Sequence, residues 1–130
     1  SPLDSAVILT PSRNAYKLYA REIIRQPIRA DLVTISACRS AGARTYAGEG
    51  LVGFAWAFLE AGARKVVAGL WEVDDDSTAA IMNLMYKGIH DGGSPAESLR
   101  AAKLSLVHSS GAVRKPYYWA PFQTFTGSLP

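Results

Sequence analysis

The sequence predicts an α/β domain built around a mainly parallel sheet. Residues 31–37 (DLVTISA) and 65–71 (KVVAGLW) are short apolar runs rich in β-branched side chains, a pattern typical of buried parallel strands. Helical segments follow each of them in the sequence. This alternation of strand and helix indicates parallel strands with helices on both faces of the sheet.

The first third of the chain predicts two strands and one helix. Residues 6–10 (AVILT) read as a short strand that Pro11 ends. Residues 16–25 place apolar side chains among charged ones, which predicts a short amphipathic helix. Residues 31–37 form the second strand.

The middle of the chain predicts a loop, a helix and a strand. Residues 38–48 are rich in Gly, Ala and Arg and suit a loop. Residues 49–61 predict a helix that Gly62 ends. Because its apolar residues are spread all round, we expect this helix to be well buried. The strand at 65–71 comes next.

Two capped helices and a last strand complete the predicted order. Asp74, Asp75, Asp76 and Ser77 supply the capping and acidic start of a helix over residues 78–90. The segment Ser94-Pro95-Ala96-Glu97 combines an N-cap, a first-turn proline and a capping-box glutamate, so it opens a helix that reaches about residue 108. Residues 117–126 are aromatic and β-branched and predict the last strand.

Composition favours an ordinary globular domain or part of one. Of the 130 residues 48% are hydrophobic and 19% charged, which excludes a disordered chain. The single cysteine forbids an internal disulfide, so we expect a reducing, cytoplasmic location. We find no signal peptide or membrane-spanning run, and we expect no metal and no cofactor.

The charge pattern argues against nucleic-acid binding. The net charge of +3 comes from residues 1–50, which carry seven basic and four acidic residues, while residues 51–130 balance. The basic residues are scattered and show no cluster interleaved with aromatic residues, so they predict solvated surface.

Cys38 follows the predicted strand at 31–37, which places it at the carboxyl edge of the sheet, where ligands bind in open α/β folds. Arg39 and Arg44 lie nearby and favour the reactive thiolate. Taken alone, this position is slightly more typical of a small buried hydrophobic residue than of a reactive cysteine. Arg39 and Arg44 are also compatible with ordinary loop charges.

A series of segments after this strand carries a family resemblance. Residues 35–38 (ISAC) are followed in order by 48–53 (GEGLVG), 55–59 (AWAFL), 61–63 (AGA), 66–68 (VVA), 70–75 (LWEVDD), 94–102 (SPAESLRAA) and 116–122 (PYYWAPF). In this order they resemble the CHAT family, the caspase- and separase-like domains often found behind tetratricopeptide repeats. The similarity extends over nearly the whole chain.

The resemblance implies a caspase-like three-layer α/β/α sandwich and, in active members, a cysteine endopeptidase with a His–Cys dyad. It makes Cys38 the expected catalytic nucleophile. We therefore expect residues 1–130 to be the C-terminal part of a single such domain. About four strands are predicted and the first begins by residue 6, so we expect the sheet to be truncated at its N-terminal side.

Two features depart from the family pattern. Family members have Glu-Thr-Gly after the cysteine, whereas this chain has Arg39-Ser40-Ala41. In caspases the dyad histidine lies about 50 residues upstream of the cysteine, and none of the 37 residues before Cys38 is histidine. We expect the base to lie in protein outside this chain, and the chain alone to be inactive.

His90 and His108 are the only histidines. Each falls at the end of a predicted helix, where a histidine usually interacts with helix carbonyls and water. We expect both to be structural.

Three further residues are candidates for substrate binding. Ser36 lies two places before Cys38, on the same strand face, and by resemblance lines the pocket for the substrate residue before the cut. A locally bonded strand serine is an even alternative. Trp71 either walls the cleft or covers the sheet end, and Asp74 either forms an acidic pocket or, the stronger interpretation, caps a helix.

These observations predict a cysteine endopeptidase domain acting in regulated proteolysis or signalling. The alternatives are a non-catalytic interaction module of the same fold and an unrelated α/β enzyme. Expected partners are a protein or peptide substrate, the N-terminal part of the same domain, repeat domains, and a second copy pairing along an open sheet edge.

Overall fold

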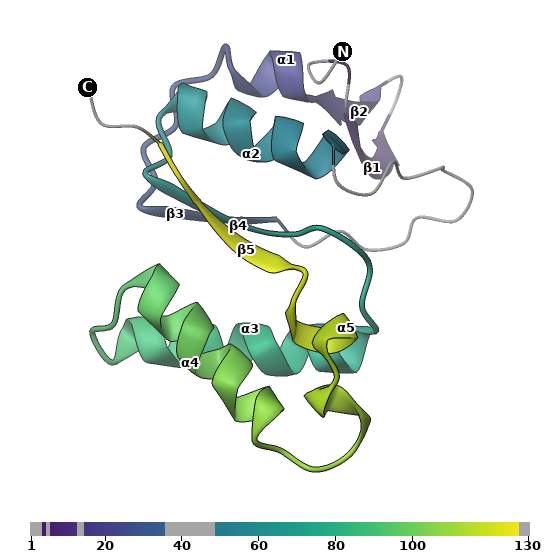
Figure 1. Cartoon of the computed structure of the whole chain (residues 1–130). Helices are drawn as coiled ribbons and strands as arrows, with labels where there is room; N and C mark the ends of the chain where they lie inside the picture. Colours follow the sequence, from purple (N-terminus) through teal and green to yellow (C-terminus); the bar gives the residue numbers. More distant parts are fainter. Residues whose placement is uncertain (1–3, 5, 13–14, 36–48, 128–130) are drawn as a thin grey trace.

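A computed structural model describes residues 4, 6–12, 15–35 and 49–127 (Figure 1). Its centre is a three-stranded sheet in the order β3 (Leu32–Ile35), β4 (Lys65–Gly69) and β5 (Phe122–Thr126). Helices lie on both faces of this sheet. The predicted α/β class is therefore confirmed, with a small sheet.

The sheet is only partly parallel. Strands β3 and β4 are parallel, as predicted, with Leu32 opposite Lys65 and Ile35 opposite Ala68. Strand β5 is antiparallel to β4, so the expected mainly parallel sheet is wrong for this pair. One helix between two strands carries the chain back to the starting edge and gives parallel strands. Here the two helices α3 (Asp75–His90) and α4 (Pro95–Val107) form a hairpin that returns the chain to the carboxyl edge of β4.

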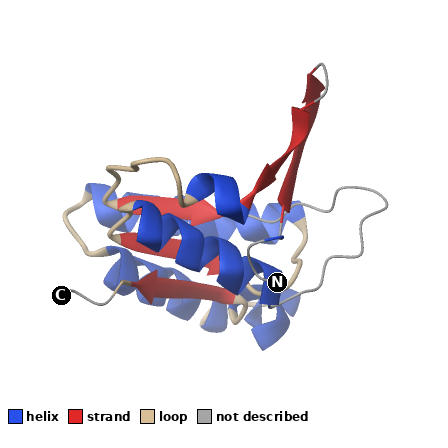
Figure 2. Ribbon diagram, turned by 90° about the horizontal axis from the view of Figure 1, so that it is seen from above, coloured by secondary structure: helices blue, strands red, loops and turns tan. Residues whose placement is uncertain are grey.

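The N-terminal region forms a hairpin that the sequence did not predict. Strand β1 (Ala6–Ser12) pairs antiparallel with β2 (Ala15–Tyr19) as a separate two-stranded sheet. Figure 2 shows the hairpin extending away from the three-stranded sheet. The predicted helix at 16–25 is therefore wrong in its first half, and the helix α1 covers only Ala20–Ile23.

Pairing across a short connection explains this difference. Residues 16–19 (YKLY) are rich in aromatic residues and sit beside a β-branched partner run, and both features favour strand over helix. Pro11 also does not end β1, which continues to Ser12. The register shifts between Ile8 and Ser12, as expected where a proline without an N–H interrupts the ladder.

The helix α2 (Glu49–Ala61) has the predicted bounds and ends at Gly62, which has a φ of 120°. Its inward face carries Phe54 and Ala57, packed with α1. The expectation of burial all round is wrong, because Val52 is 45% exposed and Trp56 is 47% exposed. These two residues are one helical turn apart on a face that neither the sheet nor α1 covers.

The helical hairpin closes the other face of the sheet. Ile81 and Met85 of α3 and Leu99 of α4 are buried with Val67 and Phe122. The N-terminus of α4 has the predicted capping box: the Glu97 N–H donates to Ser94 Oγ at 3.1 Å, and the Ser94 N–H donates to Glu97 Oε2 at 3.2 Å. Within the described ranges, no helix is long and apolar enough to cross a membrane.

The predicted last strand is shorter than expected. The 3₁₀ turn η2 (Ala112–Arg114) leads into a short helix α5 (Pro116–Trp119), and only Phe122–Thr126 forms strand. Pro116 occupies a first-turn helix position, which its fixed φ favours. The aromatic run 117–119 therefore lies on a helix at the sheet end and not within the sheet.

Candidate active site

The carboxyl ends of β3 and β4 lie at the same edge of the sheet, because the two strands are parallel and in register. Residues 36–48 follow β3 and include Ser36, Cys38, Arg39 and Arg44; all lie outside the described residues. The described half of the edge is the segment from Leu70 to Asp74 that connects β4 to α3.

Trp71 is fixed at this edge by bonds to α5. Its indole Nε1–H donates to the backbone carbonyl of Tyr117 at 2.9 Å. In return, the Tyr117 hydroxyl donates to the backbone carbonyl of Glu72 at 3.0 Å. These reciprocal bonds join segments some 45 residues apart in sequence. Trp71 itself remains 37% exposed. A rigid aromatic surface therefore stands beside the end of β4.

Tyr117 is a residue of this edge that the sequence analysis missed. It is 54% exposed and its ring meets Tyr118 edge-on, with centroids 5.2 Å apart. The prediction of a strand over residues 117–126 placed Tyr117 within the sheet, so it was not considered as a residue of the edge. Pro116 was the available signal, since a proline at this point opens a helix and so turns the next residues out of the sheet.

Asp74 caps α3, as the stronger sequence interpretation predicted. Its Oδ1 accepts from the Ser77 backbone N–H and its Oδ2 from Ser77 Oγ, both at 2.9 Å. These hydrogen bonds hold the pKa of the Asp74 carboxyl below its ordinary value. The group is exposed and ionised at neutral pH, so it supplies fixed negative charge at this edge.

We expect Asp74→Asn to lower the midpoint of urea unfolding at pH 7, because the asparagine loses the charged form that Ser77 and the helix N-terminus stabilise. A carboxyl with a lowered folded-state pKa stabilises above its unfolded pKa and loses that contribution as pH falls through the folded value. The difference between wild type and variant should therefore shrink below about pH 4. Asp75→Asn is the matched control without the cap bonds, and an equal loss in both variants would contradict the assignment.

Comparison with known proteins identifies the family. The sequence profile of the CHAT domain matches residues 1–128. The chain belongs to the CHAT domain family. A relative is tetratricopeptide repeat protein 28 of the mouse, 33% identical over 111 residues. That match covers 85% of this chain, which spans only 4% of the relative's length.

In this CHAT domain the two histidines lie at helix ends, as predicted. His90 is the last residue of α3, and a 16-residue helix places it roughly 22 Å along the axis from the carboxyl edge. His108 is the C-cap of α4, where its backbone N–H donates to the Leu104 carbonyl at 2.9 Å. Both side chains are exposed. Among the described residues, no group of three or more His, Cys, Asp or Glu side chains could hold a metal ion.

Proposed function

We propose that the chain carries the nucleophile of a cysteine endopeptidase domain, with Cys38 in that role. The observation that supports this most is the parallel pairing of β3 and β4. Cys38 follows Ile35, the end of β3, by three residues, which span at most about 11 Å. This short connection limits how far Cys38 can lie from the sheet edge that carries Trp71. Membership of the CHAT family supports the same chemistry.

The proposed reaction proceeds through a thioester. The Cys38 thiolate attacks the peptide carbonyl carbon, and the carbonyl oxygen becomes an oxyanion to which the Cys38 backbone N–H donates. When this intermediate collapses, the C–N bond breaks and a general acid protonates the leaving amine. Water then attacks the thioester and releases the acid product and the thiol. Arg39 and Arg44 would favour the thiolate.

Substrate contacts are proposed for Ser36, Trp71 and Asp74. Thr34 of β3 faces α3, where its Oγ1 accepts a 2.6 Å hydrogen bond from the Tyr86 hydroxyl. Ser36 and Cys38 lie outside the described residues, and a shared strand face for these two residues stays an expectation from their spacing in the sequence. Trp71 would form one wall of the cleft, and the Asp74 carboxylate, which keeps free lone pairs beyond its cap bonds, would attract a basic substrate residue.

The remaining parts of the proposal concern protein outside these 130 residues. We propose that a histidine base, a second oxyanion donor and further strands complete a caspase-like three-layer sandwich around β3. The tetratricopeptide repeats named in the mouse relative make repeat domains the expected neighbours in a longer polypeptide. The single cysteine is consistent with a reducing, cytoplasmic setting.

Alkylation of Cys38 tests the proposal. We expect iodoacetamide to modify the folded chain with an apparent pKa below the value of about 8.5 for a free thiol. Arg39→Ala and Arg44→Ala should each raise that pKa, while Arg114→Ala, far along the chain, should not. A thiol that stays unmodified until the protein is denatured would sink the catalytic role.

A non-catalytic interaction module is the second candidate. The feature that favours it is the lack of any histidine before Cys38, together with Arg39 where family members have glutamate. Reading the codons upstream of Ser1 separates the two functions. A strand ending in His-Gly supports the peptidase, and an upstream segment without histidine supports the interaction module.

A further inference from the structure

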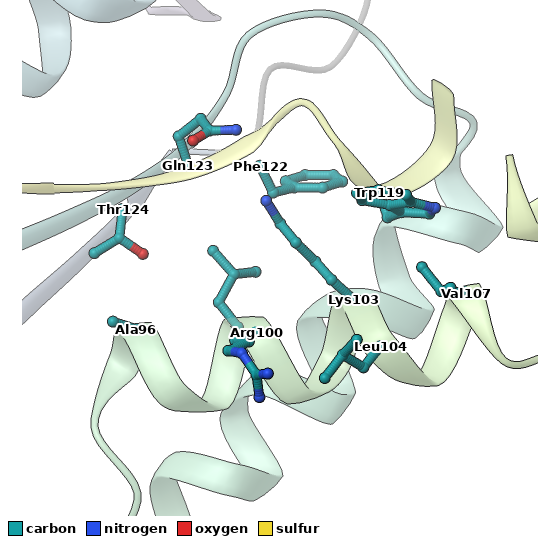
Figure 3. A pocket seen from close by; sticks show the side chains of 10 residues that line it. Ala96, Arg100, Lys103, Leu104, Val107, Trp119, Phe122, Gln123 and Thr124 are labelled. Atoms are coloured by element: carbon teal, nitrogen blue, oxygen red, sulfur yellow. The ribbon is translucent and has the colours of Figure 1, made fainter. Parts of the chain in front are cut away.

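A cavity lies on the side of the molecule formed by α4 and β5. It has a volume of about 470 Å³ and is open to solvent (Figure 3). Its apolar walls include Leu104, Val107, Trp119 and Phe122, and its two charged residues are Arg100 and Lys103. None of the lining residues that the structure describes is acidic. The cavity thus combines apolar surface with uncompensated positive charge.

The strand that borders this cavity has an open edge. The Leu70 N–H donates to the Pro121 carbonyl at 2.9 Å, which makes this opposed pair a hydrogen-bonded one. Hydrogen-bonded and non-hydrogen-bonded pairs alternate along an antiparallel ladder, so Phe122 and Thr124 belong to the second kind. Their backbone N–H and C=O groups point away from β4. No strand of the described chain pairs with that side of β5.

The same two residues also line the cavity with their side chains. Directly opposed residues of neighbouring strands place their side chains on the same face of a sheet. A strand that paired with the open edge at Phe122 and Thr124 would therefore direct alternate side chains over the cavity. The open edge and the cavity form one composite surface.

Lys103 gives this surface its preference for charge. Figure 3 shows its side chain reaching from α4 across the cavity toward Phe122. Partial burial lowers its pKa. Within the described part of the chain it has neither a carboxylate nor a hydrogen-bond acceptor. An incoming carboxylate would supply the missing partner.

We propose that this surface binds an extended acidic segment of a partner protein, which adds a strand to the open edge of β5. Backbone hydrogen bonds to Phe122 and Thr124 hold the segment. One inward side chain is an Asp or Glu that meets Lys103. The next inward side chain, two residues away, is apolar and packs on Trp119 and Leu104. The lining of this surface includes none of the candidate peptidase residues named above, and the proposal stands whether or not the chain is a peptidase.

A second copy of this chain fits the surface less well. Two β5 strands paired about a two-fold axis would bring both α4 helices onto the same face of the joint sheet. Arg100 and Lys103 of one copy would then approach the same cations of the other, and like charges across an interface disfavour that pairing. Charge complementarity selects an acidic partner instead.

The test uses a fluorescein-labelled peptide of seven residues that alternates outward threonines with inward leucine, aspartate and leucine. Binding to the 130-residue chain is followed by fluorescence anisotropy. We expect the aspartate peptide to bind roughly tenfold more tightly than one with asparagine at the centre, because a charge-assisted hydrogen bond replaces a neutral one. Added salt should reduce this preference.

Two variants assign the contacts. Lys103→Met keeps the apolar stem and should abolish the preference for aspartate, while the exposed Lys87→Met should leave it intact. Thr124→Pro removes an N–H that faces outward and not toward β4, so it should weaken binding of both peptides without unfolding the sheet. Circular dichroism checks the fold of each variant.

Three results would overturn the proposal: no binding of the aspartate peptide, equal binding of aspartate and lysine peptides, or an aspartate preference that survives in Lys103→Met. Sedimentation velocity supplies a fourth. A dimer that Thr124→Pro abolishes would show that the open edge of β5 pairs with a second copy of the chain.

Discussion

The purified 130-residue chain is expected to cleave peptides below ordinary detection, although it carries the proposed nucleophile. Collapse of the tetrahedral intermediate needs a proton for the leaving amine, and general acid–base catalysis typically contributes about 10²–10⁴-fold. A missing oxyanion donor removes roughly another 10²–10³-fold. These losses need not multiply, since catalytic groups act as a unit. Either one is enough to silence the chain.

The measurement is cleavage of a mixed peptide library by the wild-type chain, with Cys38→Ala as the control. Cleavage at normal protease rates that the alanine variant abolishes would place the base within these residues. His108→Ala and His90→Ala would then be compared. His108 is the stronger suspect, because α4 returns from the far edge of the sheet, where α3 ends at His90.

Features set by local chemistry could be predicted from the sequence. The capping box at Ser94 and Glu97 and the cap at Asp74 depend on residues three positions apart, and the structure confirms them. The bounds of α2 follow from its apolar run and from Gly62. The parallel pair β3 and β4 follows from two apolar runs separated by one helix.

Features set by distant contacts could not be predicted. Residues 16–19 show helical spacing, but pairing with β1 makes them strand. The direction of β5 depends on the helical hairpin before it, which periodicity alone does not reveal. Val52 and Trp56 look like core residues, yet the fold places no described element over them.

In the candidate site, too, local signals could be predicted from the sequence and distant contacts could not. Trp71 and Asp74 were identified because they follow a predicted strand, which is a local signal. Tyr117, the partner of Trp71, was not identified from the sequence. Its hydrogen bonds to Trp71 and Glu72 bridge some 45 residues and involve backbone carbonyls, which carry no sequence signal. Cys38 and Ser36 lie outside the described residues and stay predictions.

Gly62→Ala is expected to produce a large loss of stability. Gly62 adopts a φ of 120°, which an L-residue reaches only with strain, and an added Cβ would overlap the backbone carbonyl oxygen of Ile28. That oxygen cannot move freely, because the Ile28 N–H donates to the Ala61 carbonyl at 2.8 Å. Strain of about 1–2 kcal/mol and overpacking of about 1–3 kcal/mol together give a loss of about 2–5 kcal/mol.

Gly92→Ala is the matched control. Gly92 has a φ of 100°, but an added Cβ would meet nothing within 4 Å, so this variant carries the strain without the overlap. Urea unfolding of both variants therefore separates the two contributions. The close approach of Gly62 to Ile28 also positions the chain where it enters β3. Just before that strand, the Arg64 N–H donates to the Ala30 carbonyl at 3.0 Å. If both variants lose the same stability, the close approach of Gly62 to Ile28 does not constrain the fold, and the path into β3 is set elsewhere.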